Sequence, residues 1–202
     1  MVAKRAYRSG GAALAVLMSL SMPALAQSVA PPPLPQPVII LVDSQLITQQ
    51  CLAGQAIRTQ HDQYRQSYQS EFEAARRTLK QTEDDLVREK AVLSHEAWQA
   101  KAREFEQRVI DFNQRIQRSN LAVEKSYGVA MAELWHDFNQ VAAEIADEMG
   151  ANLVLPVQQA IYQDPRLDQT KAVIERMNKK FPVIVVPPPT VDGDPAPKAV
   201  KK

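Results

Sequence analysis

Cysteine is almost missing from this chain of 202 residues, and the one that is present, Cys51, cannot form a disulfide within its own chain. A lone cysteine cannot build a zinc site either, because the three histidines, His61, His95 and His136, are scattered along the sequence. We expect Cys51 to be a small buried apolar residue, with a link between subunits as the alternative. The sequence therefore predicts neither a disulfide scaffold nor a metal centre.

Catalytic motifs are missing as well. The sequence contains no G-x-S-x-G, no H-E-x-x-H and no glycine-rich phosphate loop. The acidic run at 83–85 lies in a predicted helix, so its side chains point in different directions and do not form a metal site. We interpret this run, and the basic spot at 76–80, as solvent-exposed helix faces. The balance of 24 basic and 23 acidic residues shows no nucleic-acid footprint. We expect no enzyme, no cofactor and no nucleic-acid partner.

The first 26 residues have the features of a secretory signal peptide. Three basic residues precede an apolar run at 12–20, and Ala24-Leu25-Ala26 is a cleavage pattern of the A-x-A type. The apolar run is shorter than the ~20 residues that a membrane span needs, which favours a cleaved signal over a transmembrane anchor. Cleavage before Gln27 would release a soluble protein outside the cytoplasm.

Proline is concentrated towards the two ends of the chain. The segment VAPPPLPQP at 29–37 predicts an extended linker, and Pro187-Pro188-Pro189 opens a tail that we expect to be disordered. The predicted division is a signal peptide at 1–26, a linker at 27–37, the first part of a body at 38–53, a helical arm at 54–133, the rest of the body at 134–186, and a disordered tail at 187–202.

Helix breakers are rare between Gln55 and Met149. This stretch has no proline, its only glycine is Gly128, and it is rich in Ala, Gln, Glu, Arg and Lys. A run of that length predicts a coiled coil, and Ser94 is a good helix N-cap, so we expect a hairpin that turns at Leu93-Ser94. About 40 residues on each side would give an arm about 60 Å long.

The two sides of the hairpin can be aligned with each other. Heptad-spaced residues pair about the turn so that the two residue numbers add up to 188. The positions between these pairs place small or polar residues opposite Trp98 and two phenylalanines, which is how packed layers interdigitate. The predicted arm seam therefore consists of Phe72, Leu79, Leu86, Phe105, Val109, Phe112 and Ile116.

Short strands flank the predicted arm at 38–42, 152–155 and 160–162, and Asp168 can cap a final helix. Three short strands bury little surface by themselves, so we expect oligomerisation to supply the missing partners. The fold class is α+β: a long antiparallel coiled-coil hairpin on a small body. The residues expected to build the body or join subunits are Ile39, Leu41, Val154, Tyr162 and Val173.

Two motifs around the arm carry a family resemblance. VIILVD closes at Asp43, and GANLVL is followed by AIYQDP and DQTKAVIERMNKK, in which Tyr162, Asp168, Thr170 and Val173 stand at the matching places. Together they resemble the OmpH/Skp family of periplasmic chaperones. The resemblance implies a homotrimer with a β-barrel-like body, whose helical arms hold unfolded outer-membrane proteins without ATP.

The chain departs from the family in charge. Between Gln55 and Met149 it has 13 basic and 17 acidic residues, whereas family arms are basic, so we expect only weak contact with membranes or lipopolysaccharide. Tyr64, Tyr68 and Trp98 are the candidate client contacts. The rival hypothesis is a structural spacer or an efflux-adaptor hairpin, although the glycine-rich lipoyl-like strands that an adaptor needs are missing.

Overall fold

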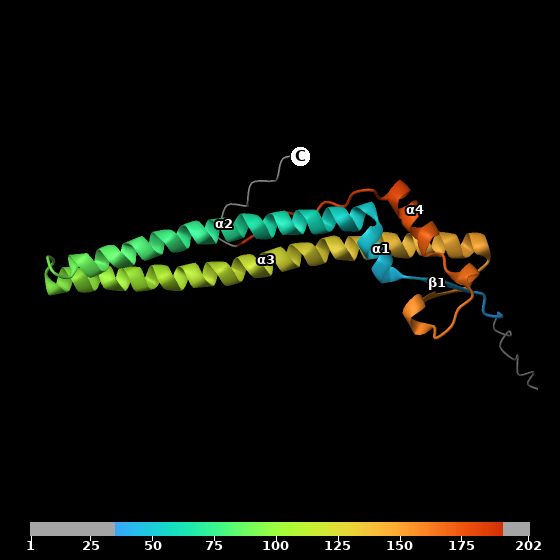
Figure 1. Ribbon diagram of the computed structural model, residues 1–202, viewed down its shortest axis with the longest axis horizontal. Coiled ribbons are helices and arrows are strands. Elements are labelled where there is room, and N and C mark those ends of the chain that lie inside the picture. The colour runs from blue at the N-terminus through green and yellow to red at the C-terminus, as the bar shows by residue number, and fades with distance from the viewer. Residues whose placement is uncertain (1–34, 192–202) are drawn as a thin grey trace, which may run out of the picture. The chain divides into compact units, whose positions relative to one another are not determined.

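A computed structural model describes residues 35–191 of the chain. The predicted signal peptide, most of the predicted linker and the tail from residue 192 lie outside the described residues. Residues from Gln36 onward form one unit, shown in Figure 1. Its elements in chain order are β1 (Ile39–Val42), α1 (Ser44–Gln50), α2 (Leu52–Glu89), α3 (His95–Met149), β2 (Leu153–Pro156), two 3-10 turns (Val157–Gln159 and Pro165–Leu167) and α4 (Thr170–Lys180).

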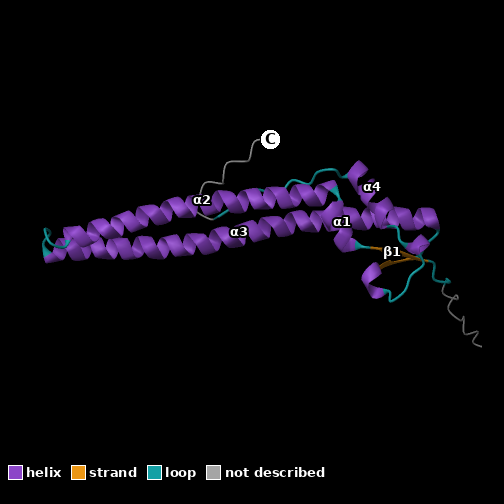
Figure 2. Cartoon of the chain, in the orientation of Figure 1, coloured by secondary structure: helices purple, strands orange, loops and turns teal. Residues whose placement is uncertain are grey.

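The sheet of the described unit contains two parallel strands, which Figure 2 shows in orange. β1 pairs with β2 in the register Ile39 with Leu153 through Val42 with Pro156. The prediction of a third strand at 160–162 is wrong, because this segment is an exposed bend in which the side chain of Tyr162 is 88% accessible. A short apolar run forms a strand only where a neighbouring strand accepts its hydrogen bonds.

The chain reverses between α1 and α2 at Cys51. The side chain of Asp43 accepts a hydrogen bond from the Leu46 amide and caps α1, while the Cys51 sulfur accepts one from the Gly54 amide and caps α2. The break between helices therefore lies at Cys51 rather than at Gly54. Gly54 lies inside α2, and a Cβ there would come within 2.1 Å of the Thr48 carbonyl oxygen. Cys51 is completely buried.

α2 and α3 form the long antiparallel hairpin that the sequence predicts. Ser94 caps α3 by accepting a hydrogen bond from the Ala97 amide, which confirms the predicted turn. α3 has 55 residues, so at 1.5 Å per residue it is about 80 Å long. The chain leaves α3 through Gly150, whose φ of 65° is a left-handed conformation that glycine adopts without strain.

α4 closes the body against the start of the chain. The Thr170 hydroxyl accepts a hydrogen bond from the Asp43 amide, and the carbonyl of Leu41 accepts one from the Gln169 amide. The predicted N-cap, Asp168, lies one residue before the actual N-cap of α4, Gln169, and its side chain accepts a hydrogen bond from the Thr170 amide. Val173 and Met177 on the inner face of α4 are completely buried, so this helix anchors the core of the body.

The predicted disordered tail begins at residue 187, and its first five residues belong to the last ten described residues, 182–191. We call these ten residues the C-terminal strap. The strap has no helix or strand, yet it runs from α4 back along α2, where Figure 1 shows it in red. Ile184, Val186, Pro189 and Val191 are buried in it. Proline prevents helix and ladder formation but not docking of an extended chain onto an apolar surface.

Candidate functional site: the surfaces of the hairpin and the body

The seam of the arm follows the predicted register. Half-buried residues recur at 72, 75, 79, 82, 86 and 89 on α2 and at 98, 102, 105, 109, 112 and 116 on α3. The Phe72 and Phe112 rings meet edge to face at 6.2 Å, and Arg115 forms an ion pair with Glu71. All seven predicted seam residues lie at half-buried positions, so the aromatic and aliphatic side chains of the seam hold the two helices together.

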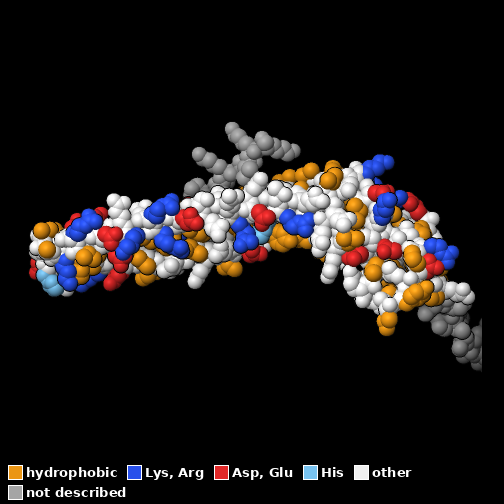
Figure 3. All heavy atoms as spheres, in the orientation of Figure 1, with side chains coloured by type: hydrophobic (Ala, Val, Ile, Leu, Met, Phe, Trp, Pro, Cys, Tyr) orange, Lys and Arg blue, Asp and Glu red, His pale blue; other side chains and the backbone are white. Residues whose placement is uncertain are grey.

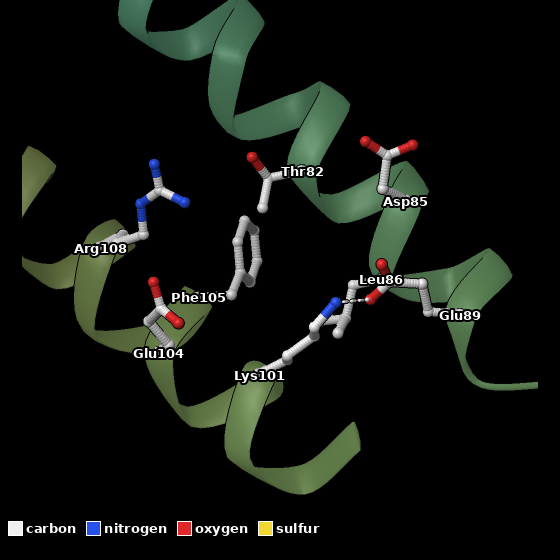
Figure 4. Close-up of a pocket in the computed structure, with 8 residues that line it drawn as sticks. All are labelled: Thr82, Asp85, Leu86, Glu89, Lys101, Glu104, Phe105 and Arg108. Atoms are coloured by element: carbon white, nitrogen blue, oxygen red, sulfur yellow. Dashed lines mark hydrogen bonds and ion pairs between the residues drawn. The ribbon is translucent and has the colours of Figure 1, made fainter. Parts of the chain in front are cut away.

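Near the tip, the seam opens into a shallow hollow of about 250 Å³. Figure 4 shows the ring of Phe105 directed from α3 towards Thr82 on α2, with the ion pair between Lys101 and Glu89 beside it. The lining is mixed, since basic Arg108 lies among acidic side chains. The hollow arises where a small side chain faces a large ring and does not concentrate one kind of charge.

The three predicted client contacts are all less accessible than expected. Trp98 is half-buried, donates from Nε1 to the Leu86 carbonyl at 3.0 Å, and has the Lys90 ammonium 4.9 Å from its ring centre. Tyr64 and Tyr68 are each only 7% exposed and belong to the same apolar cluster as the C-terminal strap. Burial raises the pKa of the Tyr64 hydroxyl above its ordinary value.

Sequence reasoning missed a set of apolar residues that face solvent along the hairpin. They lie outside the seam positions, and this could have identified them from the sequence. Figure 3 shows hydrophobic and charged side chains interspersed along one face of the hairpin. An accessible apolar side chain among charges can contact an unfolded chain without a fixed geometry. The most exposed are Val87, Val92, Leu121, Val129 and Ile110.

The charged clusters of the arm are paired locally. The Lys80 ammonium lies 3.2 Å from Glu83 and 3.1 Å from Asp84, and these carboxylates raise the pKa of Lys80. Asp85 pairs with Arg88 one turn later at 3.2 Å. The basic spot and the acidic run therefore neutralise each other in part on one solvent-exposed face. Within residues 35–191, no three His, Cys, Asp or Glu side chains come together as metal ligands.

The body presents an apolar hollow of about 380 Å³ beside the sheet. Trp135 and Phe138 of α3 meet edge to face at 5.3 Å on one side of it, and Val154 of β2 lines the other. Of the predicted body residues, Leu41 and Val173 are buried, Ile39 and Val154 are half-buried, and Tyr162 projects into solvent. Val173 belongs to the core cluster and Val154 packs against it, whereas Ile39 and Leu41 lie outside that cluster and Tyr162 lies apart from the body.

A model of the family described as "Outer membrane protein (OmpH-like)" matches residues 38–177, from β1 to the buried face of α4. The chain belongs to the OmpH-like family. This confirms the resemblance inferred from the strand and final-helix motifs. The match ends before the C-terminal strap. None of the helices in the described stretch combines the length and apolarity that a membrane crossing requires.

The OmpH-like fold also appears in a solved structure. The chain is similar to the crystal structure of a candidate outer membrane chaperone (OmpH-like) from Caulobacter crescentus CB15, with a TM-score of 0.73. The two sequences are 15% identical, and the match covers 80% of this chain and 96% of the other. At this identity the likeness establishes the fold of the hairpin and its body. A comparison with curated proteins finds no match.

Proposed function

We propose that this OmpH-like protein is an ATP-independent holdase of the periplasm, which binds unfolded outer-membrane proteins between helical arms and keeps them soluble. The observation that carries the proposal is the hairpin, which exposes apolar side chains among charges over a length of many turns. Family membership supports the same function. The role consists of binding alone, with no catalytic step, no cofactor and no nucleic acid.

The body supports assembly into a homotrimer with a β-barrel-like centre. Within the described residues β1 and β2 form a two-stranded sheet, and the edge of β2 that faces away from β1 has no strand partner there. The unpaired edge of β2 and the apolar hollow next to it offer backbone and side-chain contacts to another subunit. Exposed Ile161 and Tyr162 lie close in sequence to this edge, and burial between subunits would explain their apolar character.

Retention by the arms would rest on many weak apolar contacts. An unfolded chain gains avidity when several segments are held at once, even if each contact is weak. The arm is net acidic, and Lys80 in its basic spot is paired with Glu83 and Asp84, so a positively charged cavity does not explain capture. We therefore expect the association rate with acidic clients to change little with salt, and contact with lipopolysaccharide or membranes to be weak.

The decisive experiment dilutes a urea-unfolded outer-membrane protein into buffer containing the purified protein and no nucleotide. The holdase keeps the client soluble in a stoichiometric complex, whereas a structural spacer leaves it to aggregate. Light scattering on the processed protein should give about three times the chain mass, because unpaired strand edges require partners. A folded monomer at micromolar concentration would contradict the proposed assembly.

A further inference from the structure

The C-terminal strap is held on the hairpin in the manner of a bound peptide. From 183 to 186 its side chains alternate between the hairpin and solvent, since Ile184 and Val186 are 3% and 1% exposed while Val183 and Val185 are 55% and 69% exposed. This is the alternation of an extended strand with one face buried. The surface beneath this part of the strap therefore accepts apolar side chains from two positions that are two residues apart in an extended chain.

The hairpin also holds the backbone of the strap. Gln60 on α2 donates from Nε2 to the Ile184 carbonyl at 2.9 Å and accepts from the Val186 amide at Oε1 at 3.0 Å. Ser126 on α3 donates its hydroxyl to the Pro187 carbonyl. The Gln60 side chain thus hydrogen-bonds a backbone carbonyl and a backbone amide that are two residues apart. Such contacts bind an extended backbone of any sequence, because these groups are present in almost every peptide unit.

Aromatic side chains belong to the same site. Tyr64 and Tyr68 share one apolar cluster with Ile184, Val186 and Val191 of the strap. Aromatic faces supply large contact areas without demanding one partner geometry. We call the surface formed by Gln60, Tyr64, Tyr68, Ser126 and the neighbouring apolar residues of α2 and α3 the strap groove.

We propose that the strap groove is a binding site for an extended segment of an unfolded outer-membrane protein, and that the strap occupies it when no client is present. Strands of membrane β-barrels alternate apolar and polar residues, so one face of such a segment offers an apolar side chain at every second position, as Ile184 and Val186 do in the strap. The strap carries no charged side chain, so we expect the client segment that binds in the groove to be apolar rather than charged. The proposal rests on the holdase function and adds a defined site and its control to it.

The strap sets how strongly a client segment can bind. A segment binds only the fraction of molecules whose groove is open, so its apparent affinity falls by that fraction. Open states of such equilibria are commonly populated at about 0.1–10%, and freeing the groove should then tighten segment binding at least about tenfold. The strap contributes few residues and would yield to a client that is held at several places.

The test uses the full chain with Ile184→Asp and Val186→Asp, which place charge on the buried face of the strap. The matched control is Val183→Asp with Val185→Asp, which changes the same composition on the exposed face. The probe is a fluorescent ten-residue peptide of alternating valine and threonine. We expect the buried-face variant to bind it at least about tenfold more tightly than the parent and the control. Adding Gln60→Ala to the buried-face variant should remove most of that gain.

Equal peptide affinity in all variants would overturn the proposal, as would weaker binding by a buried-face variant whose helicity and oligomeric state are intact. If that variant does not fold, a photocrosslinking residue is placed at Tyr68 in the parent protein, and the test is which chain it crosslinks to when a client is added. Crosslinks to a saturating client support the groove, and crosslinks to the strap alone overturn it. If no protein in the series keeps an unfolded outer-membrane protein soluble, the holdase function fails instead of the groove.

Discussion

The outer arm and the base of the hairpin are made of the same two helices but are held together differently. No residue from 69 to 118 is buried, and the seam there is a single half-buried stripe on each helix. At the base, Ile57, Val141 and Met177 are completely buried, because α1, α4 and the strap add further layers. Two helices alone can cover only one stripe of each other, whereas a third layer closes the core.

The difference indicates two cooperative units of unequal stability. Regions with few buried apolar contacts open locally at low cost, so the outer arm should fluctuate while the base stays folded. A flexible outer arm suits the retention of clients of different shape, and a rigid base suits the assembly of subunits. The predictions below test this division, beginning with the largest expected effect.

Removing residues 73–115 and joining Phe72 to Ile116 through a short turn deletes the outer arm in register. We expect the shortened protein to keep the oligomeric state of the intact protein, because the sheet and α4 are untouched, and to lose most of the proposed suppression of client aggregation. The measurement compares intact and shortened proteins at equal concentration. Undiminished suppression would assign client retention to the base and defeat the arm mechanism.

Leu79→Asp tests whether the outer arm opens on its own. It places a charge in the seam opposite Val109 and should destabilise the arm by about 2–3 kcal/mol, since a carboxylate there has no partner. Hydrogen exchange should show loss of protection in the outer arm while β2 stays protected. Val87→Asp is the control: this side chain is 70% exposed, and the change should stay within about 0.5 kcal/mol. Loss of protection in the body as well would argue against two units.

Gly54→Ala tests how closely the base is packed, and Gly128→Ala in α3 is the matched substitution for comparison. The new methyl would meet the Thr48 carbonyl oxygen at 2.1 Å, so we expect a loss of about 1–3 kcal/mol in urea unfolding. Gly128→Ala meets nothing within 4 Å in the interior of α3 and should stabilise by about 0.5–1 kcal/mol. The same sign for both substitutions would contradict the close approach at the α1–α2 junction.

Acid should loosen α4 slightly. The Lys180 ammonium lowers the pKa of Glu144, and the Arg176 guanidinium, at 2.7 and 2.8 Å, lowers that of Glu148. A depressed folded pKa contributes stability above the unfolded pKa of about 4.3, and this stability is lost as the pH falls through the folded value. The protection factors of α4 amides, which compare measured exchange with the intrinsic rate at the same pH, should therefore fall below about pH 4. The variant with Glu144→Gln and Glu148→Gln should show less of this dependence, and an equal dependence would place its origin elsewhere.

Periodicity made the hairpin predictable from sequence. The turn at Ser94 and the seam register follow from heptads and a cap, which depend on residues close in sequence. The exposed apolar residues could have been found by the same register. Tyr64 and Tyr68 could not be placed correctly, because they are buried in one cluster with a segment more than a hundred positions away.

The sequence by itself determined the long helices, their turn, their pairing and the family, because local propensity and a repeated apolar pattern act within each helix. Only the tertiary structure decided which short segments pair or dock. The run at 160–162 has strand-like composition, but it has no strand partner within the described chain. The proline-rich strap has no secondary structure, but its apolar side chains are buried against the hairpin. Strand pairing and docking depend on distant groups that satisfy the backbone and bury the side chains, and no local pattern records those groups.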